Sequence, residues 1–147
     1  MISVELAASL KAAGLVWHPV TGDRFTLLTG AFDGEVFTLS DMVVEAHQSQ
    51  AGTVLGFNGT TEWALDATEA TDALWLPRED QLRALLGASF VALERVDVVG
   101  TNSAGYRVMT VLPGDGAGAD QHSAYWGDEP AEAYGRALLA LIRRATD

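Results

Sequence analysis

The chain is 147 residues long and 48% apolar, so it can bury the core of a single domain, which we expect to span residues 1–147. Twenty Asp and Glu against nine Lys and Arg give a net charge of -11, which would repel the phosphate backbone of a nucleic acid. No apolar run approaches the roughly 18 residues needed to cross a bilayer, and no basic segment at the N-terminus leads into an apolar stretch. We therefore expect a cytoplasmic protein that binds neither nucleic acid nor membrane.

The residues that most enzymes use for covalent chemistry are scarce. There is no cysteine, which excludes disulfides, thiol nucleophiles and thiolate metal sites. Lys11 is the one lysine, so lysine-based phosphate binding and Schiff-base chemistry are nearly excluded, and no Gly-x-Ser-x-Gly motif is present. Carboxylates and histidines remain as the candidates for catalysis.

Capping residues and apolar spacing predict three helices, over residues 3–13, 78–86 and 128–144. Ser3 can cap the first helix, and Pro77 and Gly87 bound the second. In the third, Pro130 suits the first turn, and an apolar stripe follows at Tyr134, Leu138, Leu141 and Ile142. This stripe is typical of a helix packed on a core, and it also leaves dimerisation through this helix open.

Alternating apolar and polar residues predict strands over residues 16–18, 25–28, 35–39, 42–47, 53–57, 60–65, 90–98, 106–112 and 122–126. Asn58-Gly59 is typical of a two-residue type I′ turn, so we expect a tight hairpin in which Val54 faces Trp63 and Leu55 faces Glu62. The acidic residues 66–72 are expected to form a loop. The order of elements predicts an α+β domain whose three helices pack mainly on one face of an antiparallel or mixed sheet.

Three histidines, His18, His47 and His122, lie in different segments, and none has the helical spacing of a zinc site. A metal-dependent hydrolase would combine Glu45 and His47, which share one strand face, with Glu62 or His18. For a carboxylate-dependent hydrolase the candidate pairs are Glu62 with Asp66 and Glu79 with Asp80. A solvated sheet face is the competing interpretation of the same residues. We predict no metal and no cofactor.

The four tryptophans, Trp17, Trp63, Trp75 and Trp126, are either core residues or, where they are exposed together, anchors for a partner. Since no catalytic set is evident, the leading hypothesis is a non-enzymatic module or adaptor that binds a protein or peptide. The expected binding site is the solvated sheet face with the Asn58-Gly59 hairpin, and it comprises Glu45, His47, Phe57, Glu62 and Trp63.

Four stretches resemble a family of small uncharacterised actinobacterial proteins that are often labelled pilus-assembly proteins: SDMVVE (40–45), VLGFNGTTEWALD (54–66), LWLPREDQLRALLG (74–87) and YGRALLALI (134–142). The resemblance covers most of the chain, but its motifs are structural and imply no functional residue. The acidity and the order of elements are also similar to those of type III secretion chaperones, which hold unfolded segments as dimers. This second resemblance implies a homodimeric chaperone as the alternative function.

Overall fold

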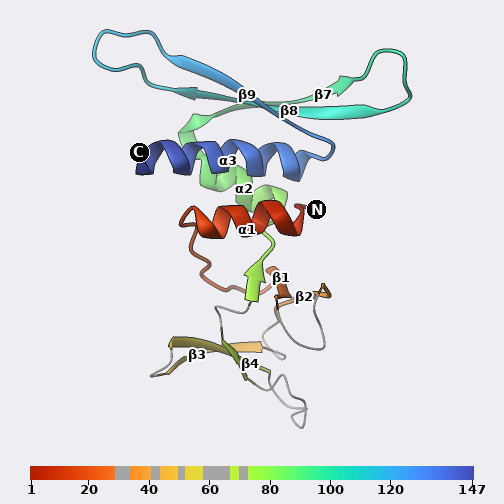
Figure 1. The fold of residues 1–147 in the computed structure, drawn as a ribbon, viewed down its shortest axis with the longest axis vertical. Coiled ribbons are helices and arrows are strands. Elements are labelled where there is room, and N and C mark those ends of the chain that lie inside the picture. The colour runs from red at the N-terminus through yellow and green to blue at the C-terminus, as the bar shows by residue number, and fades with distance from the viewer. Residues whose placement is uncertain (29–33, 41–43, 50–51, 58–66, 70–72) are drawn as a thin grey trace. The chain divides into compact units, whose positions relative to one another are not determined.

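The computed structural model describes residues 1–28, 34–40, 44–49, 52–57, 67–69 and 73–147 (Figure 1). The chain divides into two compact units: unit 1 is Met1–Leu15 with Arg78–Asp147, and unit 2 is Val16–Pro77. The single domain expected from the length of the chain stays a prediction, because two compact units can still fold as one cooperative domain.

Unit 1 holds three helices, a short 3-10 turn and one three-stranded antiparallel sheet: α1 (Val4–Ala12), α2 (Glu79–Leu86), η1 (Gly87–Ser89), β7 (Phe90–Asp97), β8 (Ala104–Leu112), β9 (Gln121–Gly127) and α3 (Pro130–Thr146). The strand order is β7-β8-β9, with Val108 of β8 opposite Leu93 and Tyr125. Helix α3 packs on β8 and β9, and α1 and α2 pack on α3 (Figure 1). The predicted α+β class and helix order are confirmed, and in this unit the helices lie on one face of the sheet.

The starts of α1 and α2 follow from their first residues. The Ser3 hydroxyl accepts a hydrogen bond from the backbone N–H of Leu6 at 3.3 Å, as expected for an N-cap. At α2, the backbone N–H of Arg78 donates to the side chain of Gln81 at 3.0 Å. The Arg78 guanidinium also bonds Asp80, which lowers the pKa of that carboxyl and keeps it charged at the positive end of the helix.

The first half of α3 is buried against its neighbours, at Ala131, Ala133, Tyr134, Gly135, Ala137 and Leu138. Gly135 marks the close approach of α1. A Cβ atom at this position would lie 2.8 Å from Leu6 Cδ2 and 3.0 Å from Ile2 Cδ1. Small side chains therefore allow α1 and α3 to pack closely.

The described residues of unit 2 form six strands in two three-stranded antiparallel sheets: β1 (Arg24–Leu27), β2 (Val36–Thr38), β3 (Val44–Ser49), β4 (Gly52–Phe57), β5 (Ala67–Glu69) and β6 (Ala73–Trp75). Their orders are β2-β1-β6 and β3-β4-β5. In the first sheet, Phe25 lies opposite both Phe37 and Trp75. Trp17 stacks on Trp75, with ring centroids 6.5 Å apart, and its indole N–H donates to Asp23 at 2.8 Å. The buried core of this sheet comprises Phe25, Leu27, Leu39 and Ala73, and the rings of Trp17 and Phe37 pack against it.

Several strand predictions need correction. Residues 16–18 form no strand, residues 67–69 form β5 instead of a loop, and the strands make three sheets instead of one. The predicted register of the 53–57 strand is wrong, because Val54 pairs with His47 on one side and Glu69 on the other. Strand β4 thus pairs with β3 and β5, and not with residues 60–65 as the Asn58-Gly59 sequence predicted. The Asn58-Gly59 turn and the predicted strand 60–65 lie outside the described residues.

Two leucines of α2 provide a matched test of the packing of α2 on α3. Leu82 is 0% exposed and Leu85 is 43% exposed, although both belong to the same short helix. We expect Leu82→Ala to lower the free energy of unfolding by about 2–5 kcal/mol, because it leaves a cavity in the core. Leu85→Ala should cost only about 0.5 kcal/mol. Urea denaturation followed by circular dichroism measures both values, and equal losses would contradict this account of the core.

Candidate functional site

The binding site expected from the sequence falls in unit 2. Glu45 and His47 lie in β3, and Phe57 lies in β4, the strand paired with β3, so the fold brings these three residues into one pair of strands. Glu62 and Trp63 lie outside the described residues. The site as a whole therefore stays a prediction.

A different surface stands out in unit 1: the face of the β7-β8-β9 sheet that is turned away from α3, called here the outer face. On the opposite face, Val108 and Thr110 are buried against α3, at 0% and 6% exposure. Strand alternation therefore places Arg107, Met109 and Val111 on the outer face. The strand register adds their neighbours from the two edge strands: Ala92, Glu94, His122, Ala124 and Trp126. Figure 1 shows α3 beneath this sheet, and none of the helices of unit 1 lies on the outer face.

Three side chains form a row across the centre of the outer face. Arg107 of β8 lies opposite Glu94 of β7 and Trp126 of β9. Its Nε donates to a Glu94 carboxylate oxygen at 2.9 Å, and its guanidinium carbon lies 5.2 Å from the centre of the Trp126 ring. The ion pair and the cation–π contact hold the indole in one place, although its residue is 48% exposed. The row thus presents an ordered aromatic side chain to solvent.

Trp126 differs in this respect from Trp17 and Trp75. Trp17 and Trp75 are partly buried and stack on each other, while Trp63 lies outside the described residues. The charged row is also flanked by apolar side chains, namely Val91, Ala92, Val96, Met109, Val111 and Ala124. An exposed aromatic residue within a partly apolar sheet face is a typical anchor for a protein partner.

The two edges of this sheet have different protection against strand pairing. Strand β7 has an irregular register between Phe90 and Ala92, and it carries the charged residues Glu94, Arg95 and Asp97. Bulges and charges are the features by which proteins protect an edge. Strand β9 has seven residues without a charge or a proline, and its register with β8 is regular. The β9 edge is therefore the one suited to pair with another strand.

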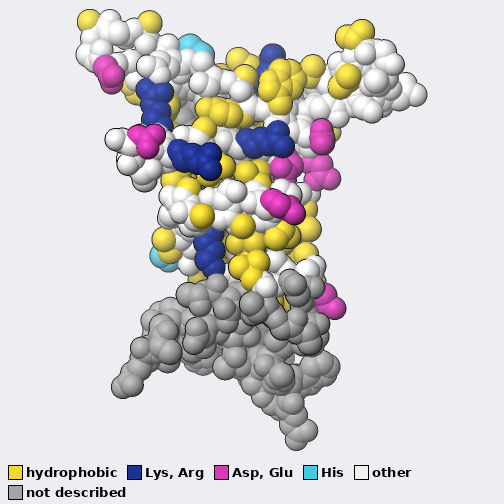
Figure 2. Space-filling view, in the orientation of Figure 1, with side chains coloured by type: hydrophobic (Ala, Val, Ile, Leu, Met, Phe, Trp, Pro, Cys, Tyr) yellow, Lys and Arg dark blue, Asp and Glu magenta, His cyan; other side chains and the backbone are white. Residues whose placement is uncertain are grey.

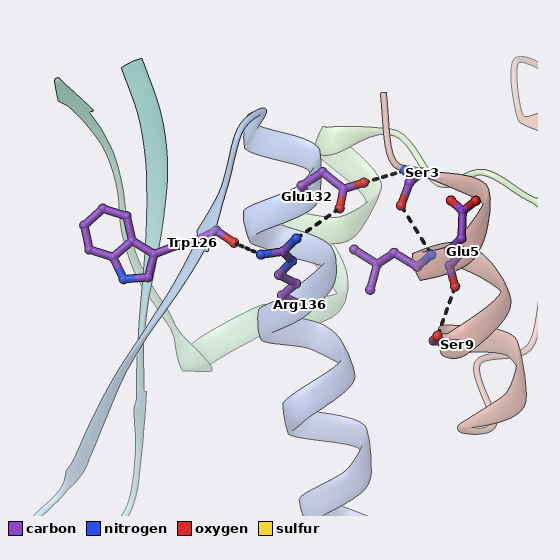
Figure 3. Close-up of polar contacts among 7 residues, drawn as sticks. Ser3, Glu5, Ser9, Trp126, Glu132 and Arg136 are labelled. Carbon is purple, nitrogen blue, oxygen red and sulfur yellow. Dashed lines mark hydrogen bonds and ion pairs between the residues drawn. The ribbon is translucent and has the colours of Figure 1, made fainter. Parts of the chain in front are cut away.

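A polar network holds the end of β9 (Figure 3). Arg136 of α3 donates to the backbone carbonyl of Trp126 at 2.9 Å, and Glu132 lies 4.0 Å from the same guanidinium. Glu132 also accepts a hydrogen bond from the backbone N–H of Ser3 at the start of α1. Figure 3 shows the indole of Trp126 directed away from α3. The backbone of Trp126 is thus fixed while its ring stays available.

A small cavity of about 30 Å³ lies between α3 and the inner face of the sheet. Its lining is rich in hydroxyl groups, with one guanidinium, and comprises Ser89, Thr110, Leu112, Ser123, Tyr125, Ala137, Ala140, Leu141 and Arg144. Arg144 also donates to the side chain of Gln121, at the start of β9, at 2.5 Å. A cavity of this size suits a water molecule or one small polar group.

Charge is distributed unevenly between the two units. Unit 2 carries nine of the twenty carboxylates but only one basic residue, Arg24, whereas the other eight basic residues belong to unit 1. Figure 2 shows Lys and Arg side chains gathered over α3. Unit 1 is therefore much less repulsive to an acidic partner than the net charge of the whole chain suggests.

Within the described residues, no group of three or more His, Asp or Glu is placed to hold a metal ion. In that same part of the chain, none of the helices has both the length and the apolar character that crossing a membrane requires.

Comparison with known proteins gives no match, whether to protein-family models, to curated proteins or to solved structures. The resemblances to the actinobacterial family and to secretion chaperones therefore stay predictions.

Sequence reasoning missed the central row of the outer face, although a signal for it was present. The hairpin of residues 90–98 and 106–112 was predicted, and Glu94 and Arg107 lie within it as opposite charges. The register across the intervening loop was needed to pair them, and a loop of this length does not fix a register.

A double-mutant cycle tests the Glu94–Arg107 pair. We expect a coupling energy of about 0.5–1 kcal/mol from Glu94→Gln and Arg107→Gln, because the pair is half-buried and the Arg107 guanidinium also contacts the Trp126 ring. The more exposed pair Arg95–Asp97, whose charged atoms lie 3.6 Å apart, is the control. Its coupling should be close to zero in urea denaturation of Arg95→Gln and Asp97→Asn. Equal coupling energies would show that the central row is not held together as described.

Proposed function

We propose that the protein is a non-enzymatic binding module that docks a protein partner on the outer face of the β7-β8-β9 sheet. The observation that carries this proposal is Trp126, which is half-exposed yet held in place by Arg107 and Glu94. An exposed indole that is already ordered loses little conformational entropy on binding. Tryptophan and arginine are also the residues most enriched among interface hot spots.

The surroundings of Trp126 support the same function. The opposite face of the sheet packs on α3, so the outer face is the one left for a partner. It combines apolar side chains with a central ion pair, a mixture typical of the core and rim of non-obligate interfaces. The ion pair also supplies directional contacts that a purely apolar patch lacks.

Site-specific photo-crosslinking tests the docking surface. A benzophenone amino acid is placed at Ala124, an exposed residue two positions from Trp126 on the outer face, so that the indole itself stays intact. The control position is Leu85, an exposed apolar residue on α2. We expect a discrete adduct in cells from position 124 and none from position 85, with the captured partner identified by mass spectrometry. The same adducts from both positions would contradict the proposal.

The purified partner then allows an affinity measurement. Trp126→Ala should weaken its binding by about 30-fold, the effect typical of a hot-spot residue, while Leu85→Ala should change it by less than about twofold. An adduct with the mass of two copies of this chain would instead support the chaperone-like homodimer and overturn docking of a different protein. An unchanged affinity in Trp126→Ala would also overturn it.

A further inference from the structure

We infer that the partner segment is an extended acidic peptide that adds to the edge of β9 as a fourth strand, with a carboxylate held at Arg144. This inference rests on the proposed function, since it specifies the partner for the same sheet. Three features carry it: the direction of the free backbone groups of β9, the arginines at both ends of that strand, and the hydroxyl-lined cavity beneath it.

The contact at Trp126 indicates which backbone N–H and C=O groups of β9 point away from β8. The Trp126 carbonyl accepts a hydrogen bond from Arg136 of α3, so it points away from β8. The N–H and C=O of one residue in a strand share a direction, and this direction alternates along the strand. His122 and Ala124 therefore also direct their backbone groups outward, where an added strand can pair with them.

Two arginines lie at the ends of this free stretch. Arg136 binds the carbonyl of Trp126 at one end, and Arg144 binds the side chain of Gln121 at the other. Arg136 has Glu132 beside it, whereas Arg144 has no carboxylate within ion-pair distance in the part of the chain that the structure describes. A guanidinium whose polar partner is a neutral amide can form a charge-assisted hydrogen bond with an added carboxylate, and this local attraction acts against the net negative charge of the chain.

The cavity gives that anion a second set of contacts. Beside Arg144 it is lined by the hydroxyl-bearing side chains of Thr110, Ser123 and Tyr125. The hydroxyl of Ser89 is also in the lining, but it already donates to the backbone carbonyl of Leu86. Hydroxyl groups can donate hydrogen bonds to a carboxylate oxygen, and the volume of about 30 Å³ suits one such group. A carboxylate at this position would be bound by a charge-assisted hydrogen bond from Arg144.

Strand alternation then specifies the pattern of the peptide. Side chains of an added strand point alternately toward α3 and toward the outer face. Those toward α3 meet Arg136 and Arg144, so they should be acidic. Those toward the outer face lie beside Ala124 and Trp126, so they should be apolar. The expected ligand is thus an extended segment in which acidic and apolar residues alternate.

The test uses two labelled eight-residue peptides, blocked at both ends. In one, Val and Glu alternate, and in the other Gln replaces every Glu. Fluorescence anisotropy at low salt should show that the Glu peptide binds at least about tenfold more tightly than the Gln peptide. Arg144→Gln should remove that difference. Arg143→Gln is the matched control, because it removes the same charge from the same turn of α3 without altering the cavity lining, and it should keep most of the difference.

Hydrogen exchange on the unaltered protein provides an independent measurement. Added Glu peptide should protect the amides of His122 and Ala124 more than those of β7. Equal binding of the two peptides, binding of neither, or equal losses in Arg144→Gln and Arg143→Gln would overturn the inference. Protection confined to β7 would do the same. None of these results would affect crosslinking from position 124 on the outer face, so failure of strand addition at β9 is distinguishable from failure of the docking function.

Discussion

Close packing around α3 is the constraint on which unit 1 depends. The sheet lies against one side of this helix, and α1 and α2 pack on it as well. A helix that has several neighbours must carry small side chains where they approach, and α3 does so at Ala133, Gly135 and Ala137. Tyr134 and Leu138 are the larger buried side chains of the same stretch, and the Tyr134 ring packs against Phe90. Burial of Tyr134 also raises the pKa of its hydroxyl, which keeps the group neutral inside the core.

The same packing explains why the candidate site lies on the sheet. All three helices of unit 1 join the layer on one side, so the outer face has no helix against it among the described elements. Arg107 and Glu94 give that face a directional contact, and Trp126 gives it an exposed apolar group. The site is thus a consequence of how the helices are distributed around the sheet.

Strand β9 belongs to both proposed contact surfaces, because its side chains point alternately to the outer face and to the cavity beside α3. His122, Ala124 and Trp126 have side chains on the outer face, while Ser123 and Tyr125 line the cavity beside α3. Arg136 and Arg144 of α3 contact this strand, although the chain as a whole is strongly acidic. A peptide that recognises both surfaces would need apolar and acidic residues in alternation, which few unrelated segments share.

The sequence by itself determined the class of the fold, because helix caps, breakers and apolar spacing act over a few residues. Ser3, Pro130 and Gly87 were enough to place the ends of the helices, and the alternation in residues 90–98 and 106–112 was enough to predict their strands. These signals are local, so they survive without knowledge of distant neighbours. Only the tertiary structure decided which strands pair. Val54 pairs with His47 and Glu69, although the Asn58-Gly59 sequence predicted a pairing with Trp63. Arg107 pairs with Glu94 on one side and with Trp126 on the other. Strand register depends on contacts between residues far apart in the chain, and for that physical reason the candidate site could not be assembled from the sequence.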